Sequence, residues 1–147
     1  MRTRSSEVGA SPTGKKLDPF FQDVLADLLA SGSLTLEDSL LVICGGETDF
    51  RNLIHAGFTN VTISNLDERM LADGGKQYDP YGWRYENAES LTAADASYDV
   101  VVVHSGLHHL RCPLHGITEM YRAARKGILG FEPNMNACTK LGARLGF

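Results

Sequence analysis

The order of apolar and polar positions along the chain predicts one amphipathic helix followed by alternating strands and helices. From Leu17 to Leu29 apolar residues recur at intervals of three and four, which is the spacing of one face of a helix. Asp18 and Pro19 fit an N-cap followed by proline at the first helical position, and Gly32 offers a stop. We expect the apolar face to pack against a sheet rather than to receive a partner.

Short apolar runs after residue 39 predict the strands of that sheet. The runs are Leu40–Cys44, Val61–Ser64, Trp83–Tyr85, Val100–His104 and Gly127–Phe131. Between them lie helix-like or polar stretches, and a last one follows: Phe50–Ala56, Glu68–Ala72, Leu91–Ala96, Leu114–Ala124 and Asn134–Phe147. This alternation predicts an α/β fold, a Rossmann-like three-layer sandwich with a mainly parallel sheet of about five strands. The first and fourth runs are apolar without alternation, which is typical of central strands covered on both faces.

Composition and charge narrow the range of functions. The 147 residues suffice for one domain, residues 17–147, behind a flexible Ser-, Gly- and Lys-rich leader, residues 1–16. A net charge of -4 argues against nucleic acid as a partner, and no apolar run approaches the roughly 20 residues of a membrane-spanning helix. The three cysteines show no paired spacing. We therefore expect a reduced, cytoplasmic protein.

Two adjacent glycines, Gly45 and Gly46, follow the first predicted strand, at the edge where a parallel sheet binds its ligand. Glycine permits backbone angles closed to other residues and removes a side chain that would block a ligand, although a tight turn without a ligand is the alternative. The spacing matches neither the G-x-G-x-x-G of dinucleotide-binding folds nor the Gly-Lys-Ser/Thr of a phosphate loop. A ligand without phosphate, such as S-adenosylmethionine, suits this turn.

Four segments within residues 38–133 resemble class I S-adenosylmethionine-dependent methyltransferases of the group called type 11. LLVICGGETD, residues 40–49, resembles the first motif of that family, with Val42 at the usual acidic position and a C-G-G turn in place of G-x-G. NVTISNLDERM, residues 60–70, resembles the strand whose terminal acid binds the two ribose hydroxyls, and Asn65 stands at that position. Asp67 takes this role if the strand runs one pleat longer, or else it begins the next helix.

The other two resembling segments imply contacts to the adenine and to the methyl group. YENAESL, residues 85–91, resembles the D-A-E-x-L that recognises adenine, which implies that Asn87 accepts from the exocyclic amine; the alternative for Asn87 is a turn. YDVVVVHSGLHHL, residues 98–110, resembles the strand that borders the methyl group and places His104 there. The implied cofactor contacts are Cys44, Gly45, Gly46, Asn65, Leu66, Asp67, Asn87, Ala88, Glu89 and His104.

Four histidines and a cysteine crowd one segment of the chain: His104, His108, His109, Cys112 and His115. Their spacing fits no zinc finger or H-E-x-x-H helix, and Pro113 interrupts them, so we expect no metal. A histidine with a pKa of about 6.5 can serve as a general base toward an acceptor, and His104 is the candidate, the alternative being a residue that only hydrogen-bonds. We expect His108 and His109 to pack and hydrogen-bond at a helix start.

The sequence therefore predicts a methyltransferase that acts on an unknown small acceptor by direct displacement. A non-catalytic binding domain of the same fold is the alternative, favoured by Val42 and Asn65, and a nicotinamide oxidoreductase is disfavoured by the missing fingerprint. Family members continue past the fifth strand with a helix and a β-hairpin. We accordingly expect a domain that is incomplete at the C-terminus, lacks the usual hairpin, and exposes an edge strand suited to pairing with a second copy.

Overall fold

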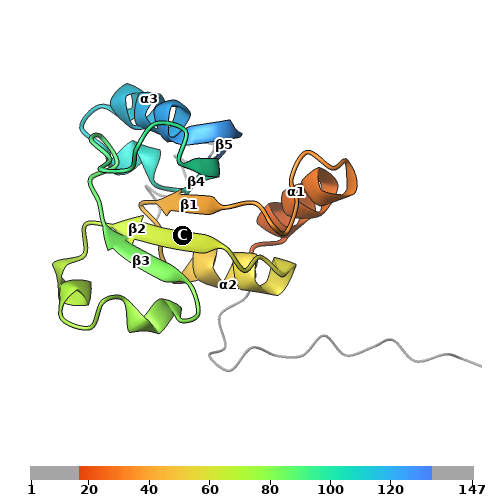
Figure 1. Cartoon of the computed structure of the whole chain (residues 1–147), viewed down its shortest axis with the longest axis horizontal. Coiled ribbons are helices and arrows are strands. Elements are labelled where there is room, and N and C mark those ends of the chain that lie inside the picture. The colour runs from red at the N-terminus through yellow and green to blue at the C-terminus, as the bar shows by residue number, and fades with distance from the viewer. Residues whose placement is uncertain (1–16, 134–147) are drawn as a thin grey trace, which may run out of the picture.

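The computed structural model describes residues 17–133, which form a five-stranded sheet between helices (Figure 1). The strands are β1 (Leu40–Ile43), β2 (Val61–Asn65), β3 (Gly82–Tyr85), β4 (Tyr98–His104) and β5 (Ala124–Phe131). Their order is β3-β2-β1-β4-β5 and every neighbouring pair is parallel, so the expected Rossmann-like fold is confirmed. The expectations of a flexible leader over 1–16 and a helix over 134–147 lie outside the described residues.

Within residues 17–133, three α-helices cover the two faces of the sheet. The core on one face joins α1 (Pro19–Ala30) and α2 (Glu47–Ala56) to the strands, and the core on the other face joins α3 (Pro113–Ala123). The Asp18 carboxylate accepts from the Phe21 N–H at 3.1 Å, which confirms the predicted N-cap of α1. None of the helices within residues 17–133 is long and apolar enough to cross a bilayer.

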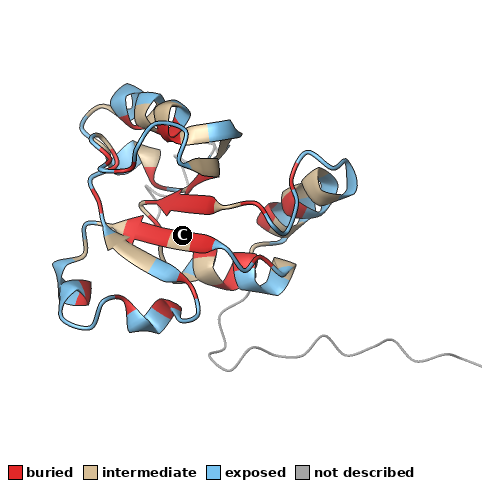
Figure 2. Ribbon diagram, viewed as in Figure 1, coloured by how far each residue is buried: buried red, intermediate tan, exposed pale blue. Residues whose placement is uncertain are grey.

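Side chains of the central strands point alternately to the two helical layers. In β1, Leu40 and Val42 belong to the core under α1 and α2, whereas Leu41 and Ile43 belong to the core under α3. The residues from Val100 to Val103 of β4 divide in the same way. Figure 2 shows β1 coloured as buried, and the residues from Val100 to Val103 of β4 are buried as well. Burial on both faces explains why the two runs are apolar without alternation.

One predicted helical crossover is not an α-helix, and the polar stretch between β3 and β4 is a loop. The segment predicted over Glu68–Ala72 is a single 3-10 turn, Glu68–Leu71, and a second short turn, Lys76–Tyr78, leads to β3. The segment predicted over Leu91–Ala96 contains no helix and runs as a loop between β3 and β4. The helix predicted over Glu68–Ala72 is therefore corrected to a 3-10 turn.

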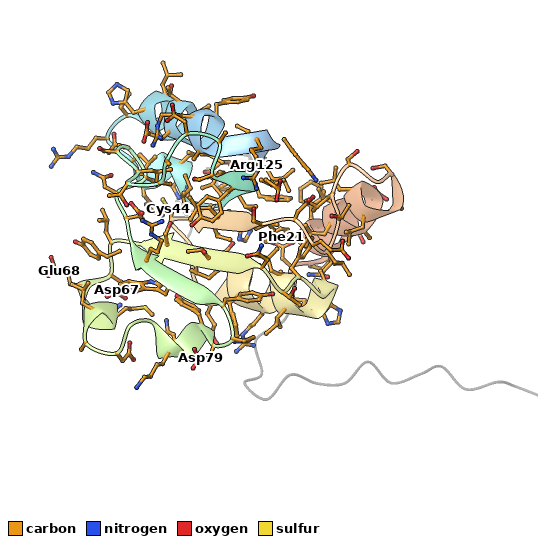
Figure 3. The ribbon with its side chains drawn as sticks, in the orientation of Figure 1. Phe21, Cys44, Asp67, Glu68, Asp79 and Arg125 are labelled. Carbon is orange, nitrogen blue, oxygen red and sulfur yellow. The ribbon has the colours of Figure 1, made fainter. Side chains whose placement is uncertain are left out.

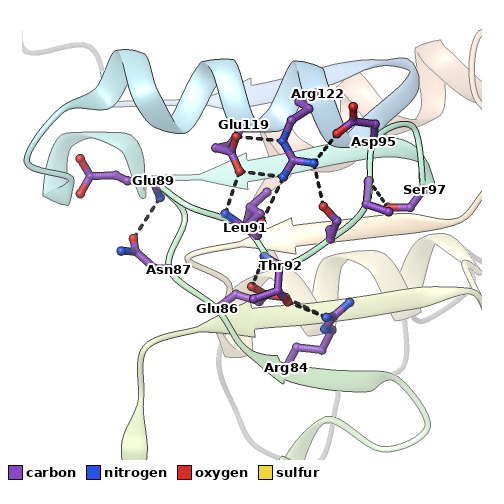
Figure 4. A network of polar contacts seen from close by, with 12 residues as sticks. Arg84, Glu86, Asn87, Glu89, Leu91, Thr92, Asp95, Ser97, Glu119 and Arg122 are labelled. Carbon is purple, nitrogen blue, oxygen red and sulfur yellow. Dashed lines mark hydrogen bonds and ion pairs between the residues drawn. The ribbon is translucent and has the colours of Figure 1, made fainter.

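The loop between β3 and β4 is held by side chains of α3 in place of helical hydrogen bonds (Figure 4). The Glu119 carboxylate accepts from the Leu91 N–H at 2.8 Å. The Arg122 guanidinium donates to the carbonyls of Leu91 and Ala93 at 3.1 and 2.8 Å. Because these side chains satisfy the backbone groups of the loop, the segment needs no helix of its own.

The last helix and the last strand join without a loop, because α3 ends at Ala123 and β5 begins at Ala124. Strand β5 lies at the end of the sheet order and, within residues 17–133, pairs only with β4. Figure 2 shows that much of β5 is only partly buried.

Candidate functional site

The two glycines after β1 have different structural roles. A Cβ atom on Gly45 would lie 2.9 Å from the side chains of Ile63 and Val42, so this position has room only for glycine. A Cβ atom on Gly46 would meet nothing within 4 Å, which leaves open space above the turn. Cys44 begins the turn with a positive φ of 52°. The close packing of Gly45 shapes the turn, and Gly46 is the position that a ligand can approach.

The first turn of α2 reaches back to the glycine turn through Asp49. Its Oδ2 atom accepts from the Gly46 N–H at 2.8 Å. Its Oδ1 atom is buried and accepts no hydrogen bond within the described residues, and the His104 Nδ1 atom lies 3.4 Å away. One buried carboxylate therefore touches both the glycine turn and the end of β4.

The residues after β2 brace the turns rather than extend the strand. The Asn65 amide donates to the Gly45 carbonyl at 2.9 Å, and its oxygen accepts from the Asp67 N–H at 3.0 Å. Asp67 caps the 3-10 turn and binds the Arg69 guanidinium at 2.7 Å, which lowers the pKa of that carboxyl. Figure 3 shows Asp67 at the same edge of the sheet as Cys44. Of the two readings of Asp67, the structure displays the one in which it begins the next helical turn, because β2 ends at Asn65.

The segment after β3 is a turn fastened to the loop before α3. The Asn87 side-chain oxygen accepts from the Glu89 N–H at 3.0 Å, which is the turn-forming role weighed as the alternative for Asn87 (Figure 4). Ala88 is buried. The Glu89 carboxylate accepts from the Cys112 N–H at 2.7 Å and so holds the residue that precedes α3.

His104 ends β4 with its imidazole between two carboxylates. Its Nε2 atom lies 3.5 Å from the Asp18 carboxylate and its Nδ1 atom 3.4 Å from that of Asp49. The rings of Phe21 and Phe131 pack against the imidazole, and the side chain is 16% exposed. The contact with Asp49 raises the pKa of His104 above its ordinary value, against the opposing effect of burial.

A second histidine at this edge pairs with an acid that was not predicted from the sequence. The Glu132 carboxylate follows β5, accepts from the N–H groups of Gly106 and Leu107 at 2.8 Å, and meets the His108 Nδ1 atom at 2.7 Å. His108 thus makes a hydrogen bond at the 3-10 turn that follows β4, as expected. The signal for Glu132 was its place directly after a parallel strand, at the ligand-binding edge of the sheet.

The edge of the sheet around Cys44 is electrically negative. Burial, together with the smaller effect of the nearby carboxylates of Glu132, Asp49 and Glu89, raises the pKa of the Cys44 thiol to about 11. The thiol is therefore neutral at physiological pH, while three acids surround the glycine turn. Such an edge favours a cation. Within residues 17–133, no three histidine, cysteine or acidic side chains come together in a group suited to a metal ion.

Comparison with known proteins shows which family the chain is similar to. A family model described as a methyltransferase domain matches residues 40–130. The ubiquinone/menaquinone biosynthesis C-methyltransferase of Roseobacter denitrificans is 32% identical over 96 residues, which cover 60% of this chain and 38% of the relative. The enzyme of the same name from Ruegeria is 29% identical with the same coverage. The chain thus spans little more than a third of the length of these relatives.

Solved structures share the fold. A protein of Methanococcus maripaludis, assigned to the S-adenosyl-L-methionine-dependent methyltransferases, superposes with a TM-score of 0.59 at 14% identity, covering 93% of this chain and 74% of its own. The trans-methyltransferase CalH in complex with SAH superposes with a TM-score of 0.57 at 13% identity, covering 76% of this chain and 38% of its own. With the family match over residues 40–130, the chain belongs to the class I S-adenosylmethionine-dependent methyltransferases.

Proposed function

We propose that this chain binds S-adenosylmethionine at the carboxyl edge of its sheet and transfers the methyl group to a small acceptor. The observation that carries the proposal is the open turn at Gly46, with the carboxylates of Asp49, Glu89 and Glu132 close by. S-adenosylmethionine is a sulfonium cation without phosphate. An acidic edge with backbone open to approach, and without a phosphate loop, suits that ligand.

The residues at this edge fit the cofactor in part. Gly46 leaves the space that the methionine end requires, and Leu66, exposed directly after β2, presents an apolar side chain for the adenine. The Asn65 side-chain amide donates a hydrogen bond to the Gly45 carbonyl, and the Asp67 carboxylate forms an ion pair with Arg69. The ribose hydroxyls would therefore be bound by the Asp67 carboxylate beside its arginine, or by backbone groups of the same turn.

The work of the protein in this reaction is mainly alignment. The cofactor supplies a methyl group that is already activated by the positive sulfur. The chain supplies a fixed position for that group, because the glycine turn is braced by Asn65 from β2 and by Asp49 from α2. Holding donor and acceptor in line in this way lowers the barrier, because the two reactants no longer have to meet and align by diffusion.

An acceptor that loses a proton needs a base, for which the edge offers two histidines. The base role predicted for His104 stays a hypothesis, and in the structure both of its nitrogens face carboxylates. We propose His108 as the better placed group, since Glu132 engages only its Nδ1 atom and the side chain is 45% exposed. In that arrangement the acid fixes the tautomer and leaves Nε2 to accept a proton.

The identity of the relatives suggests a finer proposal for the acceptor. Both are named for C-methylation in ubiquinone and menaquinone biosynthesis. We propose an aromatic quinone precursor as the first acceptor to assay. A cofactor-binding domain without turnover remains the second candidate function, supported by Val42 at the usual acidic position and by Asn65 at the ribose position.

Calorimetric titration with S-adenosylmethionine, S-adenosylhomocysteine and NAD tests the proposal. We expect the first two to bind and NAD not to bind. Gly46→Val should weaken binding at least tenfold, because its side chain would enter the open space above the turn. Gly127→Val is the matched control on β5, where an added Cβ also meets nothing within 4 Å. Absence of binding at millimolar cofactor would contradict the proposal, and binding without methyl transfer to any quinone precursor would favour the second candidate.

A further inference from the structure

We propose that His104 is a positioning residue: as an imidazolium it bridges Asp18 of α1 and Asp49 of α2, and so makes the docking of α1 beside the glycine turn dependent on pH. The bridge itself does not depend on the methyltransferase proposal. Its consequence for cofactor binding does rest on that proposed function.

The geometry joins three elements that are distant in sequence. His104 ends β4, Asp18 caps α1 and Asp49 lies in the first turn of α2. The two imidazole nitrogens each face one of the carboxylates, at 3.5 Å and 3.4 Å. A neutral imidazole carries one N–H and can donate to only one of the two acids, whereas an imidazolium donates to both.

The burial of Asp49 supplies an independent reason for the charged form. Its Oδ1 atom is buried and accepts no hydrogen bond from another described residue. A buried carboxylate oxygen without a partner is costly, and a positive imidazole next to it removes much of that cost. The other oxygen of Asp49 holds the Gly46 N–H, so the same acid connects the bridge to the glycine turn.

The groups that face the imidazole come from the starts of two helices and from the ends of two strands. The titratable groups that act on His104 are Asp49, from α2, and Asp18, from the start of α1. From α1 and β5 the imidazole meets the uncharged rings of Phe21 and Phe131. Cys44, at the end of β1, is a neutral thiol over the relevant pH range because its pKa is raised to about 11. The Glu132 carboxylate is engaged by Gly106, Leu107 and His108.

Hydrogen bonds between groups that do not titrate also join α1 to α2. The His104 bridge adds only part of the stability of this contact. The Gln22 amide donates to the Asn52 side-chain oxygen at 2.8 Å and to its carbonyl at 2.9 Å. The Asp18 N–H donates to the same side chain at 3.1 Å. Loss of the charge on His104 therefore loosens the N-terminal end of α1 without releasing the helix.

The pH dependence follows from the raised pKa of His104. The bridge contributes its full stability below the pKa of an unfolded histidine, about 6.5, and loses it as the pH rises through the higher pKa of the folded protein. The α1 helix should thus be bound more firmly at pH 6 than at pH 8.5. If the edge binds the cofactor, the affinity for S-adenosylhomocysteine, whose sulfur carries no positive charge, should fall over the same range, because the looser end of α1 no longer holds Asp49 and the glycine turn firmly in place.

Nuclear magnetic resonance titration of the histidines and urea unfolding at pH 6 and 8.5 test the bridge. We expect the His104 pKa to lie above 6.5 and to fall in Asp49→Asn. His104→Gln should lower the folding equilibrium constant roughly fivefold at pH 6 and little at pH 8.5, the size of one partly exposed ion pair. Gln22→Ala is the matched control, because it should weaken α1 docking equally at both pH values. His55→Gln, an exposed histidine on α2, should change neither.

The outcomes separate the bridge from the proposed function. A His104 pKa at or below 6.5 in the wild type, or one unchanged in Asp49→Asn, would overturn the bridge. The wild-type value alone decides this if a variant does not fold. Titration with S-adenosylhomocysteine at both pH values then tests the consequence: affinity should fall at pH 8.5 in the wild type but not in His104→Gln. Equal affinity at both pH values overturns the link to the cofactor. No binding at either pH counts against the methyltransferase proposal, but the histidine titration and the unfolding data still test the bridge.

Discussion

The Asn65 side-chain amide donates a hydrogen bond to the backbone carbonyl of Gly45 at 2.9 Å, so the ends of β1 and β2 are tied to each other at the ligand-binding edge. This hydrogen bond uses the side-chain NH2 group of Asn65, which an aspartate at the same position would lack. Asn65 therefore braces the glycine turn from the position where the family resemblance implies a ribose-binding carboxylate.

Replacing Asn65 should destabilise the protein in a graded way. Asn65→Ala removes the hydrogen bond to Gly45 and should cost about 1 kcal/mol of unfolding free energy. Asn65→Asp places a carboxylate against the Gly45 carbonyl and should cost about 2 kcal/mol, because two acceptors then face each other. Urea unfolding measures both, with Asn60→Ala on the exposed turn before β2 as the control. An Asn65→Asp variant as stable as the wild type would show that the tie is unimportant.

Adding one methyl group at each of the two glycines should separate their roles. In Gly45→Ala the new Cβ would lie 2.9 Å from Ile63 and Val42, so we expect a loss of about 1–3 kcal/mol from overpacking. Gly46→Ala meets no atom within 4 Å and keeps an extended φ of -150°, so it should change stability by less than about 0.5 kcal/mol. Thermal or urea unfolding of the pair checks this. Equal losses would mean that the turn is shaped by both glycines.

An acid at the opposite, amino edge of the sheet should govern stability at low pH. The Asp99 carboxylate accepts from the Ser39 N–H and hydroxyl at 2.9 and 2.8 Å, and from Arg125 at 3.1 Å. The Arg125 side chain, followed by Ser39, lowers the pKa of Asp99. The resulting stability is present above the pKa of an unfolded aspartate, about 3.9, and is lost as the pH falls toward the lower folded value.

Asp99→Asn should accordingly cost about 2 kcal/mol at pH 7, since a charge-assisted interaction is replaced by a neutral one. The difference from the wild type should shrink in urea unfolding at pH 2 to 3. Asp67→Asn provides a partly exposed control, whose ion pair with Arg69 lies at the surface, and its unfolding midpoint should stay close to that of the wild type. A pH-independent effect of Asp99→Asn would point to packing rather than charge.

The loop between β3 and β4 should depend on one arginine of α3. Arg122→Met keeps the apolar stem but removes the donors to the carbonyls of Leu91 and Ala93, so we expect a loss of about 2 kcal/mol. The measurement is urea unfolding together with limited proteolysis, which should become faster within residues 91–97. Arg69→Met, at an exposed arginine, should leave both unchanged. Unaltered proteolysis in Arg122→Met would mean that Glu119 holds the loop alone.

Much of the sheet could be predicted because its signals are local. The four valines from Val100 to Val103 form a continuous apolar run, which is typical of a strand covered on both faces. They lie within β4, which begins at Tyr98. The path of the polar stretch Leu91–Ala96 could not be predicted, because this loop is stabilised by Glu119 and Arg122, which lie some 30 residues further along the chain. A local pattern carries no trace of partners at that distance.

The candidate site was predictable in place but not in detail. Parallel strands end at one edge, so Gly46, Asn65 and His104 were expected together there. The partners of His104 were not foreseeable, because the sequence predicts Asp18 as a helix cap alone and assigns no role to Asp49. Each of them accepts a hydrogen bond at the start of a helix and also faces His104.

The direct passage from Ala123 of α3 to Ala124 of β5 constrains how this sequence can change in length. A deletion inside α3 would turn the rest of the helix by about 100°, and a slip of β5 by one residue would send its core side chains to the opposite face. No loop between α3 and β5 can compensate for such a change. A change in the length of one element therefore requires a matching change in the other. Insertions should be tolerated instead between β3 and β4, where side chains rather than a helix hold the path of the backbone.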